Sequence, residues 1–389
     1  MKTKKGYLSR TVNELKPSGI RRFFDLASGM EGVVSLGVGE PDFVTPWTVR
    51  EAAILSLEEG YTSYTANAGL LELREEIATY LTKNFNVTYN PKSEIIVTVG
   101  ASQAIDIALR SILDPDDEVL VVEPCFVSYS PLVSLAGGTP IPVQAEADGF
   151  KISPDKLRAA ITPKTKAIMI CSPNNPTGTM LNRKELEEIA AIAKESDLLV
   201  ISDEIYAELV YDESYTSMAA IEGMKDRTIL ISGFSKGFAM TGWRLGFVCA
   251  PEELSQAMLK VHQYAMMCAP TMAQYAGLEA LKNGNDEVDE MRKSYRRRRN
   301  YMVSSFNELG LECHSPGGAF YVFPSIKSTG LTSDQFAEQL LIEEKVAVVP
   351  GNVFGESGEG YVRCSYAASI EQLQEAIKRF RRFLKNHQK

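Results

Sequence analysis

The stretch Ser232-Gly-Phe-Ser-Lys236-Gly-Phe-Ala-Met-Thr-Gly-Trp-Arg244-Leu-Gly-Phe247 is a glycine-rich segment that carries one lysine and, eight residues later, one arginine. The apolar run before it, residues 227–231, is typical of a buried strand. Lys236 is therefore expected just beyond the carboxyl end of a strand, where open α/β sheets bind their ligands. A lysine in this place is either a solvated surface charge or a desolvated amine able to form a Schiff base with a carbonyl cofactor, and small, apolar neighbours favour the second.

The composition is that of a large, acidic chain. It has 389 residues, 44% of them hydrophobic, and a formal net charge of −9. A chain of this size can form a large core and more than one domain. Its charge argues against nucleic acid or an anionic membrane as the main partner. The basic run 296–299 lies in a predicted helix and is interpreted as a solvated face. The apolar stripe of that helix is Met291, Tyr295, Met302 and Phe306.

Cysteine, histidine and the N-terminus restrict the chemistry and the compartment. The six cysteines show no C-x-x-C spacing and mostly lie in apolar runs, which fits a reducing cytoplasm. No apolar segment follows the charged N-terminus, and nowhere do about eighteen apolar residues run together, so a soluble, unexported protein is expected. The three histidines are widely separated, which gives little support to a zinc site or a histidine-based triad.

The hydrophobic pattern predicts an α/β fold with two domains. From residue 45 to 285, strands and helices alternate, which predicts a large domain with a mostly parallel, seven-stranded sheet covered on both faces. Its strands are predicted at Glu94–Val99, Val119–Val122, Thr139–Val143, Lys166–Cys171, Leu198–Ser202, Arg227–Ile231 and Leu245–Ala250. Residues 286–389 predict a smaller α+β domain, to which residues 1–44 are expected to return.

Three further segments follow predicted strands at the same edge of the sheet. Gly100-Ala101-Ser102 opens a helix, so its free N–H groups and the Ser102 hydroxyl suit an anion, although Ser102 could simply be an N-cap. Asp203 ends another strand, where an aspartate is more often a helix cap. Asn175 lies in the turn Ser172-Pro-Asn-Asn-Pro-Thr-Gly178, whose simplest interpretation is chain reversal. Their convergence with Lys236 favours a shared site.

The segment around Lys236 resembles the pyridoxal-phosphate lysine motif of class I and II aminotransferases, S-x-S-K-x-x-x-x-x-G-x-R. Lysine, glycine and arginine all keep their offsets. The chain also resembles this family in its L-G-x-G-E-P-D-F, N-P-T-G, D-E-x-Y and P-G-x-x-F segments, and the resemblance runs from about residue 15 to the C-terminal helix. It implies fold type I. One departure is Gly233, where the family often has a phosphate-binding serine; Ser232 and Ser235 stand on either side.

The resemblance implies how the cofactor pyridoxal 5′-phosphate is held. Lys236 would form the covalent link and move protons, and Arg244 would bind the phosphate together with Gly100, Ala101, Ser102 and Ser235. Asp203 would face the pyridine nitrogen.

The remaining positions complete the cofactor site across two subunits. Tyr206 and Asn175 would contact the phenolic oxygen of the cofactor. Phe126 would cover the ring face, although an ordinary core phenylalanine is about equally compatible with the sequence. Tyr64 would reach the phosphate of the other subunit, which would make a homodimer obligatory.

For the substrate, Gly39 would border the α-carboxylate and Arg363 would bind it. A guanidinium offers a two-point contact to a carboxylate, whereas the alternative is an exposed strand arginine. Residues 17–24 are expected to line the pocket for the substrate side chain.

The resemblance predicts an aminotransferase that moves an amino group between an L-amino acid and a 2-oxo acid, 2-oxoglutarate or pyruvate, in a ping-pong cycle. Candidate substrates are alanine, aromatic amino acids, aspartate and N-acetyl-diaminopimelate, and the sequence leaves the choice open. The alternative is a pyridoxal-phosphate-dependent lyase that catalyses β-elimination on the same fold. A non-catalytic regulator that holds the cofactor is disfavoured, because no additional N-terminal DNA-binding segment is evident.

Overall fold

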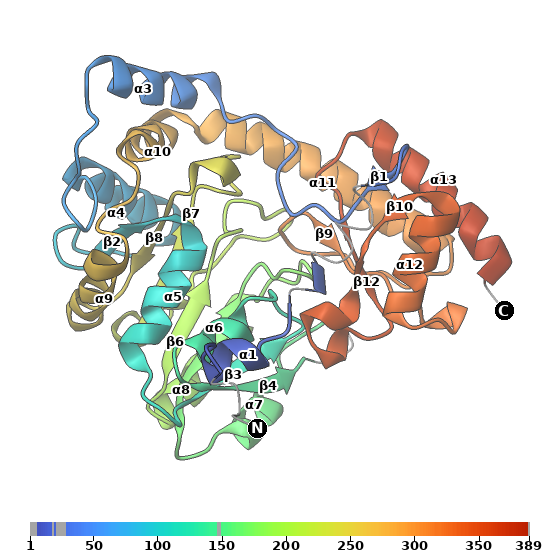
Figure 1. Cartoon of the computed structure of the whole chain (residues 1–389), viewed down its shortest axis with the longest axis horizontal. Helices are drawn as coiled ribbons and strands as arrows, with labels where there is room; N and C mark the ends of the chain where they lie inside the picture. The colour runs from blue at the N-terminus through green and yellow to red at the C-terminus, as the bar shows by residue number, and fades with distance from the viewer. Residues whose placement is uncertain (1–5, 18, 21–28, 146–148, 388–389) are drawn as a thin grey trace.

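The computed structural model describes residues 6–17, 19–20, 29–145 and 149–387 (Figure 1). Its largest element is a seven-stranded sheet with the order β2-β8-β7-β6-β5-β3-β4. The strands are β2 (Ile95–Thr98), β3 (Glu118–Glu123), β4 (Thr139–Gln144), β5 (Thr165–Cys171), β6 (Leu199–Asp203), β7 (Thr228–Gly233) and β8 (Gly246–Cys249). Each predicted strand is present within two residues of its expected bounds, and the α/β prediction is confirmed.

Strand direction decides which residues share an edge of this sheet. Strands β4, β3, β5, β6 and β7 are parallel, whereas β8 runs antiparallel to both β7 and β2. The carboxyl ends of β2, β5, β6 and β7 therefore lie at one edge, and β8 begins at that same edge. Residues that follow those four strands, and residues that precede β8, are brought together there.

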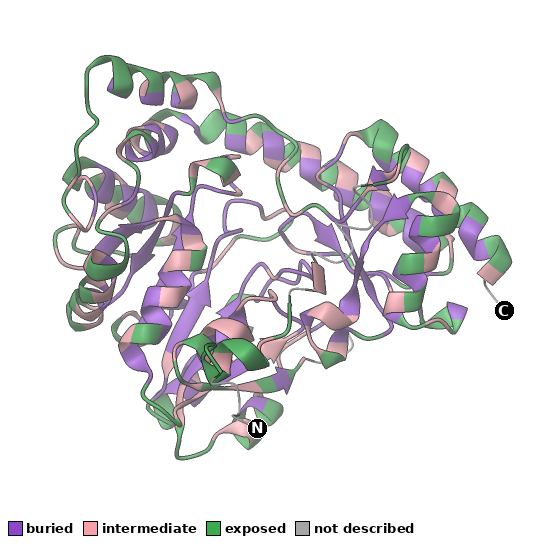
Figure 2. Ribbon diagram, viewed as in Figure 1, coloured by how far each residue is buried: buried purple, intermediate pink, exposed green. Residues whose placement is uncertain are grey.

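Helices cover both faces of the sheet, because its strands are apolar on both sides (Figure 2). Ile229 and Ile231 pack toward the face covered by α5 (Gly100–Ile112), α6 (Tyr129–Leu135) and α9 (Glu252–Ala265). Leu230 packs toward the opposite face. That face is covered by α4 (Leu71–Phe85), α10 (Thr271–Asn283), α7 (Pro154–Ala160) and α8 (Arg183–Glu195), with α3 (Trp47–Glu58) outside α10. Helix α8 begins with a capping box formed by Asn182 and Glu185.

A second region, orange to red in Figure 1, follows the large sheet. It contains α11 (Asn285–Glu308), α12 (Ser333–Glu344), α13 (Ile370–His387) and a three-stranded antiparallel sheet of β11 (Val349–Pro350), β12 (Val362–Ser365) and β9 (Tyr321–Val322). Strand β1 (Val34–Ser35) pairs in parallel with β10 (Val346–Ala347), so residues 34–35 lie in this region. The short helix α1 (Arg10–Glu14) instead contacts α6, which covers the large sheet. The domain limits at residues 45 and 285 stay a prediction.

The basic run at 296–299 is a solvated face only in part, because Arg296 and Arg297 are exposed as predicted whereas Arg299 is buried. Arg299 is only 4% exposed and donates hydrogen bonds to Asp212 Oδ2 at 2.6 Å and to the carbonyl oxygen of Pro316 at 2.9 Å. It lies four residues after Tyr295, so it falls on the buried stripe of α11. The four apolar residues of that stripe are buried as predicted. No helix among the described residues is long and apolar enough to cross a membrane.

Candidate active site

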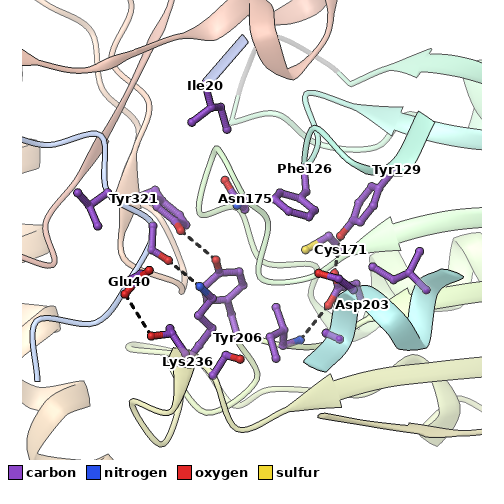
Figure 3. A pocket seen from close by; sticks show the side chains of 18 of the residues that line it. Ile20, Glu40, Phe126, Tyr129, Cys171, Asn175, Asp203, Tyr206, Lys236 and Tyr321 are labelled. Carbon is purple, nitrogen blue, oxygen red and sulfur yellow. Dashed lines mark hydrogen bonds between the residues drawn. The ribbon is translucent and has the colours of Figure 1, made fainter. Parts of the chain in front are cut away.

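A cavity of about 660 Å³ lies where the second region meets the carboxyl edge of the large sheet (Figure 3). The predicted site residues that line it are Gly39, Ala101, Ser102, Phe126, Asn175, Asp203, Tyr206, Ser235, Lys236, Arg244 and Arg363. Residues as far apart in the chain as Gly39 and Arg363 thus face one space. Two predicted residues, Gly100 and Tyr64, do not line it.

Lys236 lies in the turn after β7, with its amine inside the cavity. Its Nζ donates a hydrogen bond to the carbonyl oxygen of Gly39 at 2.6 Å and lies 5.9 Å from the ring centroid of Tyr206. Burial is the main cause that lowers the pKa of Lys236, to about 8, and the nearby guanidinium groups of Arg363 and Arg244 act in the same direction. A substantial fraction of this amine is therefore neutral near physiological pH and able to act as a nucleophile or a base.

Asp203 ends β6 and is buried beside Lys236. Its Oδ2 accepts a hydrogen bond of 2.6 Å from the Tyr129 hydroxyl, and its Oδ1 accepts one of 3.2 Å from the N–H of Ile205. Burial raises the pKa of the carboxyl group, and these two bonds oppose the rise. A turn follows Asp203 and no helix begins there, so the helix-cap alternative is wrong. Sequence reasoning missed Tyr129; its only signal is its position three residues after Phe126.

An anion cradle forms where α5 meets Arg244. Gly100 has φ +77°, and a Cβ added to it would lie 2.7 Å from Nη2 of Arg244, so the glycine lets the guanidinium rest on the helix start. Helix α5 has its N-cap at Val99 and no side-chain cap, so the capping role weighed for Ser102 is wrong. Nη1 of Arg244 donates a hydrogen bond to the carbonyl oxygen of Thr241 at 3.1 Å, and the guanidinium forms no ion pair with a described residue. A helix N-terminus and a guanidinium without a negative partner at one point attract an anion.

Close packing explains why position 233 is a glycine, where the resembled family often has a phosphate-binding serine. Gly233 pairs with Gly246 across β7 and β8, and a Cβ on Gly233 would lie 2.8 Å from the Cα of Gly246. Gly246 in turn touches the start of α5, since its own Cβ would lie 2.7 Å from the N atom of Ala101. Of the two neighbouring serines, Ser232 donates to the carbonyl oxygen of Glu204, whereas Ser235 lines the cavity.

Arg363 comes from β12 and is 3% exposed, so the alternative of an exposed strand arginine is wrong. It donates hydrogen bonds to Asn175 Oδ1 at 2.9 Å and to the carbonyl oxygen of Gly37 at 2.7 Å. Its Nε is buried without a partner among the described residues. Arg363 as a whole lines the cavity together with Gly39 and Lys236.

Aromatic side chains form the remaining walls. Phe126 lines the cavity and meets Tyr129 edge to face, with ring centroids 5.7 Å apart. The hydroxyl of Tyr206 lies 3.0 Å from that of Tyr321, a second residue that sequence reasoning missed. Tyr321 falls within an apolar run, a pattern that predicts only burial in the core. In the predicted pocket segment 17–24, Ile20 lines the cavity, whereas residues 18 and 21–24 lie outside the described residues.

Residues 31–380 match the family model described as aminotransferase class I and II. The chain belongs to this family. This aminotransferase is 68% identical to the Bacillus subtilis (strain 168) protein YugH, itself named only provisionally as an aminotransferase, over 97% of this chain and 98% of that one. It is 49% identical to the aromatic-amino-acid aminotransferase 2 of Thermococcus litoralis, again over 97% and 98%. A solved structure of Thermus thermophilus aspartate aminotransferase with maleate matches with a TM-score of 0.93 and 41% identity, over 97% of this chain and all of that one.

These similarities confirm fold type I and transamination for this aminotransferase, and they do not favour the lyase alternative. Members of the family use pyridoxal phosphate. The residues present fit that cofactor, because the cradle at Gly100 and Arg244 suits a phosphate and a partly neutral Lys236 suits an aldehyde.

Proposed function

We propose that the residues of this cavity perform the transamination in the following roles. Arg244, the first N–H groups of α5 and the hydroxyls of Ser102 and Ser235 hold the cofactor phosphate. The support is the unpaired guanidinium against Gly100, which gives a dianion two sources of positive potential. Phe126 covers one face of the cofactor ring.

Tyr206 and Asn175 hydrogen-bond the phenolic oxygen of the cofactor, and the Asp203 carboxylate faces the pyridine nitrogen and keeps it protonated. Bound pyridoxal phosphate then supplies a sink for the electrons released at the substrate α-carbon. Lys236 binds the cofactor covalently, and its freed Nζ removes the proton from the substrate α-carbon. The observation that carries this assignment is the buried, partly neutral Lys236 beside a buried Asp203.

The substrate α-carboxylate binds Arg363, with Gly39 at its border. The position of Arg363 supports this role, because its guanidinium is a buried positive charge in the lining of the cavity that also holds Gly39 and Lys236. The candidate amino donors are alanine, aromatic amino acids, aspartate and N-acetyl-diaminopimelate, with 2-oxoglutarate or pyruvate as acceptor. Relatives named for aromatic amino acids, aspartate and N-acetyl-LL-diaminopimelate support this range.

A half-reaction tests the proposed chemistry. The purified enzyme, loaded with pyridoxal phosphate, is mixed with one amino acid at a time and without a 2-oxo acid. Transamination converts the absorbance of the lysine-bound cofactor to that of pyridoxamine phosphate and releases one equivalent of 2-oxo acid. Continuous release of ammonia without this conversion would contradict the proposal and identify a lyase. The panel of donors also ranks the substrates.

The site is completed by a second copy of the chain. Tyr64 is 79% exposed and lies in a surface patch of large apolar side chains, which is typical of an interface. The loop around residue 65 and the loop that ends at residue 271 are joined by hydrogen bonds, so the exposed apolar residues of both loops lie near one another. The members of the patch are Tyr61, Tyr64, Tyr264, Met266 and Met267.

Subunit mixing tests whether Tyr64 acts across the interface. Tyr64→Ala and Lys236→Ala are each expected to be poorly active at limiting pyridoxal phosphate. In a hybrid dimer, one site combines the intact Lys236 of one chain with the intact Tyr64 of the other. Unfolding and refolding the two variants together should thus restore about a quarter of the sites, because random pairing makes half of the dimers hybrid. No recovery in confirmed hybrids would refute the assignment.

A further inference from the structure

Tyr321 connects the two parts of the fold at the cavity (Figure 3). It comes from β9 in the three-stranded sheet and is 1% exposed. Its hydroxyl lies 3.0 Å from that of Tyr206, which follows β6 of the large sheet. Its ring centroid lies 4.5 Å from Cζ of Arg363. One side chain thus contacts the residue proposed for the cofactor phenolic oxygen and the residue proposed for the substrate carboxylate.

The contact between the hydroxyls of Tyr321 and Tyr206 restricts which of the two can donate to the other. Burial raises the pKa of both Tyr206 and Tyr321, so both hydroxyls stay protonated at physiological pH. Only one of the two protons can lie between the oxygens, because each hydroxyl has a single donor. If Tyr206 is to donate to a third group, Tyr321 must donate to Tyr206. A donor that is itself hydrogen-bonded in this way is a stronger donor.

The ring contact decides how the guanidinium lies. Arg363 is planar, and its Cζ lies 4.5 Å from the ring centroid of Tyr321 and 5.0 Å from that of Phe354. Bonds to Asn175 and Gly37 hold two of its nitrogens. The two rings and two bonds restrict the guanidinium to one orientation, and its unpaired Nε then points in a set direction. Without the Tyr321 ring, the guanidinium of Arg363 would be freer to rotate about its side-chain bonds.

We propose that Tyr321 is a positioning residue with two separable effects: its hydroxyl donates to Tyr206 and strengthens the donation by Tyr206, and its ring holds the Arg363 guanidinium in the plane that receives a carboxylate. The proposal rests on the proposed roles of Tyr206 and Arg363. Tyr321 and Arg363 lie on hydrogen-bonded neighbouring strands, β9 and β12, and the hydroxyl contact of Tyr321 with Tyr206 links that sheet to the large one.

Tyr321→Phe tests the hydroxyl, since it removes one oxygen and keeps the ring. The readout is the pH at which the lysine-bound cofactor changes its absorbance, measured without substrate. A weaker donor at Tyr206 stabilises the negative phenolic oxygen less, so this pH should rise by roughly 0.1 to 0.7 units, about 10–30% of the effect of one charge-assisted hydrogen bond. The KM values for amino acid and 2-oxo acid should change less than about twofold, because the ring contact persists.

Tyr321→Leu tests the ring. It should raise the KM for the amino acid and for the 2-oxo acid together by about 5- to 30-fold, which corresponds to one buried cation–π contact. Tyr361→Leu is the matched control. Tyr361 is a buried tyrosine two residues from Arg363, and its ring lies over Lys327 outside the cavity. This control should leave KM and the absorbance transition near those of the wild type.

The outcomes distinguish the positioning role of Tyr321 from the roles proposed for Tyr206 and Arg363. No absorbance shift in Tyr321→Phe, when Tyr206→Phe does shift it, would refute the hydroxyl role. An unchanged KM in Tyr321→Leu, when Arg363→Lys does raise it, or an equal rise in Tyr361→Leu, would refute the ring role. If Tyr206→Phe and Arg363→Lys themselves have no effect, the roles proposed for those two residues fail instead.

Discussion

Gly100→Ala should weaken cofactor binding, and this loss should exceed the loss caused by backbone strain alone. The three atoms nearest to the new Cβ would all belong to Arg244, with Nη2 at 2.7 Å, Cζ at 3.2 Å and Nη1 at 3.4 Å. The guanidinium is the end of a long side chain, so it can move away. In moving, it leaves the helix start where the phosphate is proposed to bind.

Two costs follow from this geometry. Alanine at φ +77° is strained by about 1–2 kcal/mol, which lowers the free energy of unfolding. Displacement of Arg244 removes one charge-assisted hydrogen bond to the phosphate, worth about 1.5–3 kcal/mol. The second cost alone predicts a dissociation constant about 10- to 150-fold higher.

The apoprotein is titrated with pyridoxamine phosphate, which cannot form the covalent link. Tryptophan fluorescence reports the binding. Gly330→Ala is the matched control, because Gly330 has φ +72° and no atom within 4 Å of an added Cβ. It should share the strain and lose stability in thermal unfolding while it keeps cofactor affinity. If Gly100→Ala and Gly330→Ala bind the cofactor equally well, Arg244 does not hold the phosphate.

Three further predictions address single groups. In the apoprotein, acetylation of Lys236 by acetic anhydride should reach half of its maximal rate near pH 8 and level off above about pH 9, where its lowered pKa leaves the amine mostly neutral while ordinary lysines remain mostly protonated; peptide mass mapping checks this, and a rate that still climbs through pH 10 would contradict the lowered pKa. Asp203→Asn should reduce kcat about 100- to 1,000-fold with a much smaller loss of cofactor affinity, and equal losses in both would indicate a structural role. Arg363→Lys should reduce kcat/KM for amino and 2-oxo acids about 10- to 150-fold with unchanged cofactor content, and an equal loss toward an amine that lacks the carboxylate would show that Arg363 does not read the substrate.

Local patterns in the sequence were enough to predict the large sheet and most of its site. Apolar runs marked the inner strands, because a strand covered on both faces must be apolar throughout. The edge strand β4 is the exception, since most of its residues are exposed or half-buried. Since parallel strands end at one edge, the order of the motifs in the chain already brought Lys236, Asp203, Asn175 and Gly100 together. Each of these assignments depends on residues close in sequence and on one rule of sheet geometry.

Contacts between distant segments were decided only in three dimensions. Tyr129 and Tyr321 read as core aromatics, because burial has the same hydrophobic signature whether or not a hydroxyl reaches a carboxylate or another hydroxyl. Arg299 was expected to be solvated as part of a basic run, but acceptors from distant segments, at Asp212 and Pro316, stabilise it in a buried position.

The site also depends on where the chain returns to itself. Pairing of β1 with β10 anchors the N-terminal segment, whose Gly37 and Gly39 then accept hydrogen bonds from Arg363 and Lys236. Arg363 reaches Asn175 across 188 residues. Periodicity reports which side of an element is buried, but it does not report which partner that side meets. The sequence by itself therefore determined the strands and the edge at which the motifs meet, and the tertiary structure decided the partners, because those come from segments far apart in the chain.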